Sequence, residues 1–170
     1  MRTKSQSKSK NWHDKVYFGL HYDLHAQKTD TELGLRVTHE MLRKTWEKIK
    51  PDWIQCDCKG HSGYTSYPTK VGYPSPGIVR DALRIHREVT EELGIPLVMH
   101  YSGIRDDVAM KHHPEWQRIN VDGTSESGCA CPRSDYVTDM IIPQFIELID
   151  EYDVDGFWVD GDIWATKPCY

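Results

Sequence analysis

Several features that mark other protein classes are missing or scarce in this chain of 170 residues. No apolar run approaches the roughly 20 residues of a transmembrane helix, so the sequence predicts no membrane partner. Basic residues are not in excess, because 21 Lys and Arg stand against 26 Asp and Glu, and the net charge of -5 argues against a nucleic-acid partner. Phenylalanine is scarce, with 3 Phe against 6 Trp and 9 Tyr. Aromatic rings with polar tips favour surfaces that pack and hydrogen bond at once, including sugar sites.

The N-terminal segment also lacks the apolar stretch of a secretory signal. Met1–Lys10 is basic and rich in serine, so we predict a disordered tail over residues 1–14 and one domain over residues 15–170. This pattern favours a cytoplasmic location. Self-association into a homo-oligomer stays open.

The five cysteines do not form a recognisable metal motif. In a reducing compartment we expect them to be mostly free thiols. Zinc sites typically use two intervening residues between cysteines, whereas two pairs here have only one, Cys56-x-Cys58 and Cys129-x-Cys131.

What the chain does contain is a regular alternation of apolar strands and amphipathic helices. Such an alternation predicts an α/β fold with a parallel sheet. The predicted strands cover residues 16–22, 53–57, 96–101 and 155–160, and the predicted helices cover 35–50, 78–93 and 136–152, the last bent early by Pro143.

Two architectures fit this alternation: a doubly wound sheet and a (β/α)8 TIM barrel. No G-x-G-x-x-G or P-loop follows a strand, which removes the usual reason for a doubly wound sheet. Polar residues end every strand instead, as in barrels, whose chemistry lies at the carboxyl ends of the strands. We therefore predict the N-terminal half of a barrel, four parallel strands and three helices, truncated because a whole barrel takes about 250 residues. The strand-end residues are Asp23 and His25, then Asp57, Lys59 and His61, then His100, Tyr101 and Ser102, then Asp160 and Asp162.

Asp160 is the strongest catalytic candidate, because it ends the apolar strand Phe157-Trp158-Val159. A fixed carboxylate in that place could attack an anomeric carbon, as retaining glycosidases require. The structural alternative is an Asp that caps the next segment or makes an Asx-turn. Four polar strand ends meeting on one face favour the catalytic interpretation.

Strand alternation places His21, Asp23 and His25 on one side of the first strand. These residues could bind the hydroxyls of a sugar or hold a metal ion. They could equally include a buried histidine that bonds only to a backbone carbonyl.

The remaining candidates are ring and donor side chains around the same strand ends. Lys59 and His61 precede Tyr64 and Tyr67 in a loop that suits a hydroxyl-rich ligand, or in a solvated loop whose tyrosines pack on the rim. His100 and Tyr101 end a buried strand that needs a partner for them. Trp116 and Trp158 could stack on a sugar face, although Trp116 could equally anchor its own loop.

A resemblance runs from about Val16 to Gly161 in register through the four strands. The segments Tyr17-Phe18-Gly19-Leu20-His21-Tyr22-Asp23-Leu24-His25, Lys59-Gly60-His61-Ser62-Gly63-Tyr64, His100-Tyr101-Ser102, Gln144–Tyr152 and Asp155-Gly156-Phe157-Trp158-Val159-Asp160-Gly161 resemble the α-L-fucosidase-like glycoside hydrolases. More closely, the chain is similar to their relatives described as hypothetical glycosyl hydrolases.

The resemblance implies roles for three residues. The fourth-strand Asp of a Trp-x-Asp-Gly pattern is that family's nucleophile, which implies Asp160, and its sugar-binding histidines imply His25 and His61. Here Gly60 and Ser62 replace a His and an Asp of the family's Lys-His-His-Asp-Gly-Phe stretch. The first motif also departs from the usual Ile-His-Trp-Gly. The family's general acid lies beyond the fourth strand, hence beyond residue 170.

The sequence therefore predicts a retaining glycoside hydrolase domain that acts on a carbohydrate substrate and needs no cofactor. Asp160 would be the nucleophile, and the sugar-binding set would be Asp23, His25, Lys59, His61, His100, Tyr101, Trp116 and Trp158. One alternative is a metal-dependent hydrolase with His21, Asp23, His25 and Asp160 around one divalent ion. Another is a carbohydrate-binding or assembly fragment without catalysis. We expect the chain alone to be inactive, since it would lack the general acid.

Overall fold

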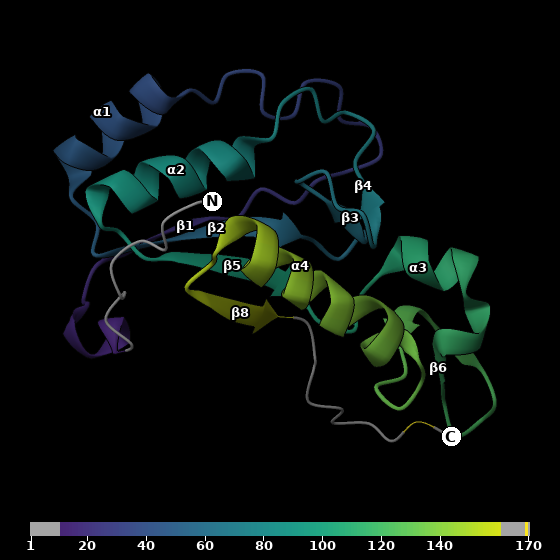
Figure 1. Ribbon diagram of the computed structural model, residues 1–170. Helices are drawn as coiled ribbons and strands as arrows, with labels where there is room; N and C mark the ends of the chain where they lie inside the picture. The colour runs from purple at the N-terminus through teal and green to yellow at the C-terminus, as the bar shows by residue number, and fades with distance from the viewer. Residues whose placement is uncertain (1–10, 161–168, 170) are drawn as a thin grey trace.

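Four parallel strands form the centre of the computed structural model, which describes residues 11–160 and residue 169. Their spatial order is β1, β2, β5, β8, and all four point the same way (Figure 1). The prediction of a parallel α/β sheet is confirmed. Within the described residues the sheet is open and does not close into a barrel. The strands cover Gly19–Tyr22 (β1), Trp53–Lys59 (β2), Leu97–Ser102 (β5) and Gly156–Asp160 (β8).

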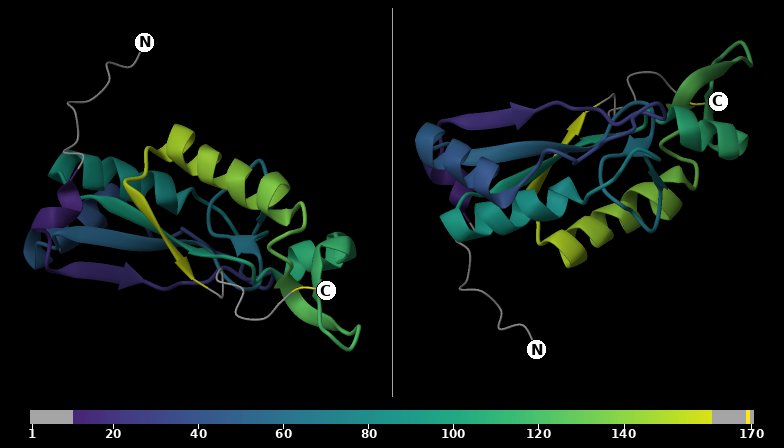
Figure 2. Two further views of the ribbon diagram at one scale, coloured as in Figure 1. Left: turned by 90° about the horizontal axis from the view of Figure 1, so that it is seen from below. Right: turned by 90° about the horizontal axis from the view of Figure 1, so that it is seen from above.

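Three helices cover one face of this sheet: α1 (His39–Ile49), α2 (Ala82–Leu93) and α4 (Ile142–Tyr152). Figure 2 shows the strands in open view from below and the helices in front of them from above. Both α1 and α2 begin later than their apolar spacing predicts. The reason is capping, because the Thr38 side chain accepts from the Met41 amide and the Asp81 side chain accepts from the Arg84 amide.

The predicted early bend of the third helix is present. Residues Val137–Ile141 form a π-helical turn, and α4 follows with Pro143 in its first turn. Proline has no amide hydrogen to donate, so the regular ladder of hydrogen bonds changes there.

The main core lies between the sheet and these helices. Strand side chains on the helical face are buried, with Ile54, Leu97 and Met99 fully inaccessible. Trp46 of α1 and Leu148 of α4 pack onto them. The opposite face carries the alternate side chains of each strand, among them the polar residues of the candidate site.

The long connections contain more structure than the sequence predicts. Short strands β3 (Tyr64–Thr65) and β4 (Tyr73–Pro74) extend the sheet beside β2. After β5 the expected loop instead holds an ordered unit at the carboxyl end of the sheet (Figure 1). This unit consists of α3 (Asp107–His112), the 3-10 turn η2 (Pro114–Trp116), β6 (Gln117–Ile119) and β7 (Ser125–Ala130).

A buried ion pair explains why this unit is ordered. Lys59 at the end of β2 is fully buried, and its Nζ donates to the carbonyls of Ser102 and Arg105 at 3.0 and 3.1 Å. The same Nζ lies 3.2 Å from Oδ2 of Asp106, which caps α3 by accepting from the Ala109 amide. The network joins the end of β2 to the start of α3, a contact between residues too far apart in sequence for local patterns to predict.

Part of the segment predicted as a tail has a defined structure. Trp12–Lys15 form a 3-10 turn (η1), and the Trp12 indole packs on Trp53 and donates to the Asp155 carbonyl at 3.3 Å. A tryptophan with such partners orders the chain around it. Residues 1–10 and Asp162 lie outside the described residues.

The cysteines differ in part from the expectation of free thiols. Cys56 and Cys58 are free thiols, and both are buried, as is Cys129. Burial raises the pKa of Cys58. Cys131 and Cys169 form a disulfide instead.

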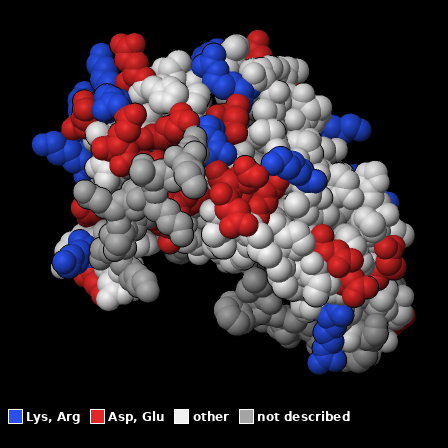
Figure 3. Space-filling model, in the orientation of Figure 1, with Lys and Arg blue, Asp and Glu red and all other residues white. Residues whose placement is uncertain are grey.

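The helices that cover the sheet carry charges of both signs on their exposed side. Over α1 and α2, acidic and basic side chains are intermixed (Figure 3). Arg43 of α1 pairs with Glu92 of α2, and His39 pairs with Glu88 at 2.7 Å. Among the described residues, no helix is both long enough and apolar enough to cross a membrane.

Candidate active site at the carboxyl ends of the strands

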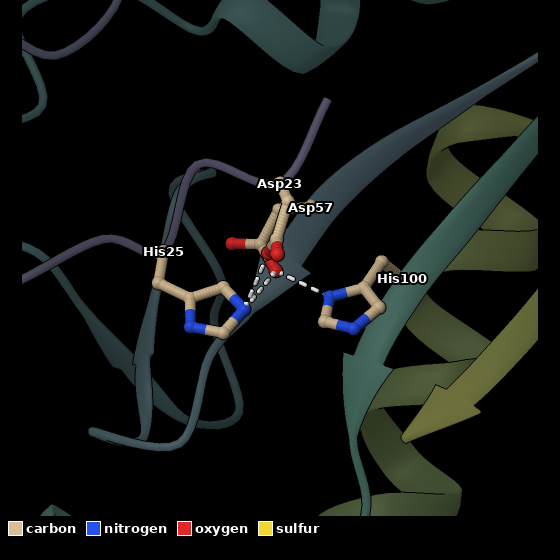
Figure 4. A group of neighbouring side chains, drawn as sticks. All are labelled: Asp23, His25, Asp57 and His100. Atoms are coloured by element: carbon tan, nitrogen blue, oxygen red, sulfur yellow. Dashed lines mark hydrogen bonds and ion pairs between the residues drawn. The ribbon is translucent and has the colours of Figure 1, made fainter. Parts of the chain in front are cut away.

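Side chains at the carboxyl ends of β1, β2 and β5 meet at one edge of the sheet. Asp23 and His25 follow β1, Asp57 lies in β2, and His100 lies in β5. Figure 4 shows these four side chains turned toward one another from three neighbouring segments. We call Asp23, His25, Asp57 and His100 the His–Asp cluster. The convergence predicted from the strand ends is thereby confirmed for these residues.

The contacts within the His–Asp cluster are short. Nε2 of His25 lies 2.7 Å from Oδ1 of Asp23 and 3.7 Å from Oδ1 of Asp57. Nδ1 of His100 lies 2.8 Å from the same Asp57 oxygen. The two imidazole rings stack with 5.3 Å between centroids and 11° between planes. One nitrogen or oxygen of each residue lies within 4.8 Å of the corresponding atom of every other.

Asp57 is the buried centre of the cluster, with a side chain only 1% exposed. The sheet register sets this position, because Asp57 is the cross-strand partner of His100. Its Oδ1 accepts from His100, while its Oδ2 has no hydrogen-bond partner among the described residues. The hydrogen bond to Asp57 raises the pKa of His100, because a nearby carboxylate favours the imidazolium form.

Asp160 lies on the other side of the His100 ring. Its Oδ2 is 3.5 Å from Nε2 of His100, and its side chain is 49% exposed. The ring of His100 therefore stands between a buried carboxylate and an accessible one. Trp158, two residues earlier in β8, is 56% exposed, so the strand presents an open ring and an open carboxylate together.

His61 completes the polar edge. Its ring lies 5.5 Å from that of His25, and its Nδ1 contacts the Ser102 hydroxyl. Burial lowers the pKa of His61, and Asp160 acts in the opposite direction.

Gly60, directly before His61, makes room for the ring of His25. A methyl group on Gly60 would stand 2.6 Å from Cγ of His25, closer than real contacts allow. At the position of Gly60 the motif that this sequence resembles has a histidine. In the structure the imidazole of His25, from the segment that follows β1, fills the space beside Gly60.

Three of the sequence-predicted site residues are buried and make contacts within the protein instead. Lys59 is bound to Ser102, Arg105 and Asp106 as described above. Tyr101 is fully buried and donates its hydroxyl to the side-chain oxygen of Gln144. Trp116 is 7% exposed and stacks on His113 with 3.9 Å between ring centroids.

The metal-binding alternative predicted from sequence names a partly different set of ligands. It groups His21 and Asp160 with Asp23 and His25, whereas the structure groups Asp57 and His100 with them. His21 is exposed and contacts His100 only through its ring, at 5.3 Å. The sequence places Asp57 among the strand-end residues but in neither predicted ligand set, because the pairing of its strand with the strand of His100 is not visible in the sequence.

Comparison with known proteins gives a likeness of fold. No protein-family model matches the chain, and no curated protein matches it. Solved structures do match, and they include the α-L-fucosidase isoenzyme 2 from Paenibacillus thiaminolyticus, with a TM-score of 0.78 at 20% identity. That match covers 91% of this chain and 24% of the fucosidase chain.

Two further fucosidase structures agree. The Thermotoga maritima α-fucosidase in complex with a mechanism based inhibitor matches with a TM-score of 0.55 at 19% identity, over 75% of this chain and 29% of its own. The α-L-fucosidase AlfC, in complex with Fuca(1,6)GlcNAc, matches with a TM-score of 0.64 at 14% identity, over 89% and 62%. The chain is thus α-L-fucosidase-like in fold and spans about a quarter of the length of the Paenibacillus enzyme.

Proposed function

We propose that this chain is the nucleophile-bearing part of a retaining glycoside hydrolase, with the fold of the first half of a TIM barrel. The substrate would be a glycoside related to α-L-fucosides. One observation carries the proposal: Asp160 stands half-exposed at the carboxyl end of β8, beside Trp158 and facing His100, in a chain with a fucosidase-like fold.

The proposed reaction follows from the position of Asp160. Its carboxylate attacks the anomeric carbon, the bond to the leaving group breaks, and a glycosyl-enzyme ester forms that water then hydrolyses. His100 donates from Nδ1 to Asp57 and faces Oδ2 of Asp160 with Nε2, which holds the nucleophile in place. Asp57 acts through His100 as a positioning residue.

The sugar would lie over the polar edge. Asp23, His25, His61 and His100 supply donors and acceptors for hydroxyl groups, and Trp158 supplies a ring face. We assign Lys59, Tyr101 and Trp116 to the support of this edge, because their polar atoms or rings are taken up by protein contacts.

A retaining mechanism needs a second carboxyl group about 5–5.5 Å from the nucleophile to protonate the leaving group. Asp57 is committed to His100, and Asp23 lies 2.7 Å from the imidazole of His25, so neither is a good general acid. Because neither carboxylate suits the role of general acid, we expect the 170-residue chain not to turn over aryl glycosides.

The test is therefore a reaction that needs the nucleophile but no acid. A 2-deoxy-2-fluoro-α-L-fucosyl fluoride carries a leaving group that departs without protonation, and its ester with the enzyme is slow to hydrolyse. We expect the intact mass of the chain to rise by one fluorofucosyl group, with peptide mapping that places the label on Asp160. The Asp160→Asn variant should stay unlabelled, and Asp122→Asn, in an exposed turn, should label as the wild type does.

Labelling of another residue, or equal labelling of Asp160→Asn, would contradict the assignment of the nucleophile. Sugar binding that is unchanged in Asp160→Asn, with no labelling by fucosyl, galactosyl or glucosyl fluorides, would favour a non-catalytic carbohydrate-binding protein.

A further inference from the structure

We propose that the His–Asp cluster is a Zn²⁺ site, with Asp23, His25, Asp57 and His100 as its four ligands. Binding the ion requires neither a sugar nor a reaction at Asp160. Zinc takes the unprotonated form of His100, so the zinc-bound cluster is an alternative to the sugar-binding state described above. The zinc would link three parts of the chain: the segment that follows β1, the strand β2 and the strand β5.

The spacing of the donor atoms fits a tetrahedral ion. Zinc bonds of about 2.0–2.2 Å place neighbouring ligand atoms roughly 3.3–3.6 Å apart. The contacts of 2.7, 2.8 and 3.7 Å around His25, Asp57 and His100 lie within about 1 Å of that range. Small side-chain rotations bring the four atoms to bonding distance around one centre.

Unpartnered buried atoms point to a ligand at this place. The side chain of Asp57 is only 1% exposed. Its Oδ2 is buried and has no hydrogen-bond partner among the described residues. Nε2 of His25 is also without a hydrogen bond, since its approach to Asp23 at 2.7 Å lacks the geometry of one. Buried polar atoms of this kind are rare unless an ion or water satisfies them. A cation between the two atoms would satisfy both.

The donor set selects the metal. Two imidazole nitrogens and two carboxylate oxygens suit zinc and similar transition ions, whereas Ca²⁺ and Mg²⁺ prefer oxygen ligands alone. A histidine that binds metal through one ring nitrogen usually directs the other toward a carboxylate. His100 meets this condition, because Nδ1 faces the cluster and Nε2 faces Asp160 at 3.5 Å.

Two of the four ligands are at least partly exposed, so an ion can reach the cluster from solvent. Asp23 has a side chain 59% exposed, that of His25 is 28% exposed, and those of Asp57 and His100 are buried. Zinc would enter past Asp23 and be held from beneath by Asp57. Gly60 keeps the space that the His25 ring needs to reach the ion.

The experiment is a titration of the metal-free 170-residue chain with ZnCl₂, followed by isothermal calorimetry and by elemental analysis after gel filtration. We expect one zinc per chain. Asp57→Asn and His25→Gln should each lower the affinity at least 10-fold. The matched control is His39→Ala, because His39 faces Glu88 at the same 2.7 Å on an exposed helix without further ligands. It should bind zinc as the wild type does.

X-ray absorption at the zinc edge separates this site from the thiols, and we expect nitrogen and oxygen neighbours only. Sulfur neighbours, less than half a zinc per chain, or wild-type affinity in both Asp57→Asn and His25→Gln would overturn the proposal. Circular dichroism verifies that each variant folds, and His25, on a partly exposed loop, provides the reading if Asp57→Asn does not fold. None of these outcomes depends on whether the chain reacts with a glycosyl fluoride.

Discussion

Two groups of buried charge at the carboxyl end of the sheet look alike in composition and differ in how completely they are satisfied. In the first, Lys59 makes three contacts and Asp106 accepts from Lys59, from the Ala109 amide and from the Tyr136 hydroxyl at 2.8 Å. Both side chains are at most 1% exposed. In the second, the His–Asp cluster, Asp57 is equally buried but leaves one oxygen without a described partner.

This difference distinguishes a network that stabilises the fold from a cluster that can bind a ligand. A network whose donors and acceptors are all used has nothing left to offer a ligand, so it stabilises the fold. A cluster with unused atoms at an accessible edge gives up stability in exchange for the capacity to bind. We therefore expect substitutions in the Lys59 network to affect folding and substitutions in the His–Asp cluster to affect binding.

The largest expected effect on stability is that of Lys59→Met. Removing one partner of a buried ion pair leaves Asp106 charged and buried, which costs about 3–5 kcal/mol of unfolding free energy. Urea denaturation measures it. The control is Lys70→Met, because Lys70 pairs with Glu151 at 3.0 Å but is 75% exposed, and an exposed pair contributes under about 1 kcal/mol. Equal losses in the two variants would remove the distinction between the networks.

A smaller loss should follow from Asp57→Asn in the absence of metal. This change weakens the charged hydrogen bond to His100, which is worth about 1.5–3 kcal/mol. It also removes a charge that has no cation beside it when zinc is absent. Urea denaturation in EDTA would refute the comparison if this variant lost as much stability as Lys59→Met.

The pH dependence of stability should differ between two histidines. The pKa of His100 is raised by its hydrogen bond to Asp57, so its contribution is present below about pH 6.5 and is lost as the pH rises through the raised value. His86 is partly buried, with its ring centroid 5.5 Å from that of Trp46, and the loss of solvent contact lowers its pKa. Its contribution is present above about pH 6.5 and is lost as the pH falls through the lowered value.

We therefore expect the stability lost in His100→Gln to grow between pH 8 and pH 5, and the stability lost in His86→Leu to shrink. Urea denaturation in EDTA at the two pH values measures both. Changes of the same sign in the two variants would show that the Asp57 contact does not set the behaviour of His100.

A further loss of stability, about 1 kcal/mol, should come from Gly60→Ala. The added methyl group would stand 2.6 Å from Cγ and 2.7 Å from Cβ of His25, and because rotation of the ring leaves Cβ in place, the segment of His25 has to shift. Binding should suffer more, because the displaced ring no longer faces Asp57, and zinc affinity should fall about 10-fold or more. Calorimetry with ZnCl₂ measures this. Unchanged affinity would mean that Gly60 does not position His25.

Local sequence patterns are sufficient to predict the main helices of this fold. The apolar spacing of 35–50 and 78–93 finds α1 and α2, and only the capping residues Thr38 and Asp81 shift their starts. The unit from α3 to β7 is missed, because its order depends on the contact of Lys59 with Asp106, and no periodicity reports a contact across 47 residues of chain.

The candidate site divides in the same way. Asp160, His61 and His100 are found as strand-end residues, because parallel strands bring their carboxyl ends together. The pairing of Asp57 with His100 depends on β2 and β5 being neighbours in register, which the sequence does not specify. Lys59 and Tyr101 also end strands, but a register shift after Asp57 and the alternation of faces turn them into the protein.

The most direct test of the central claim, that this edge of the sheet binds a sugar, is an NMR titration of the histidine rings with L-fucose. Long-range ¹H–¹⁵N spectra of the 170-residue chain resolve the imidazoles one by one, and residue-specific variants assign them. We predict shifts at His25, His61 and His100 that saturate with fucose, and none at His39 or His86. No saturable shift at His25, His61 and His100, or equal shifts at His39 and His86, would contradict the account.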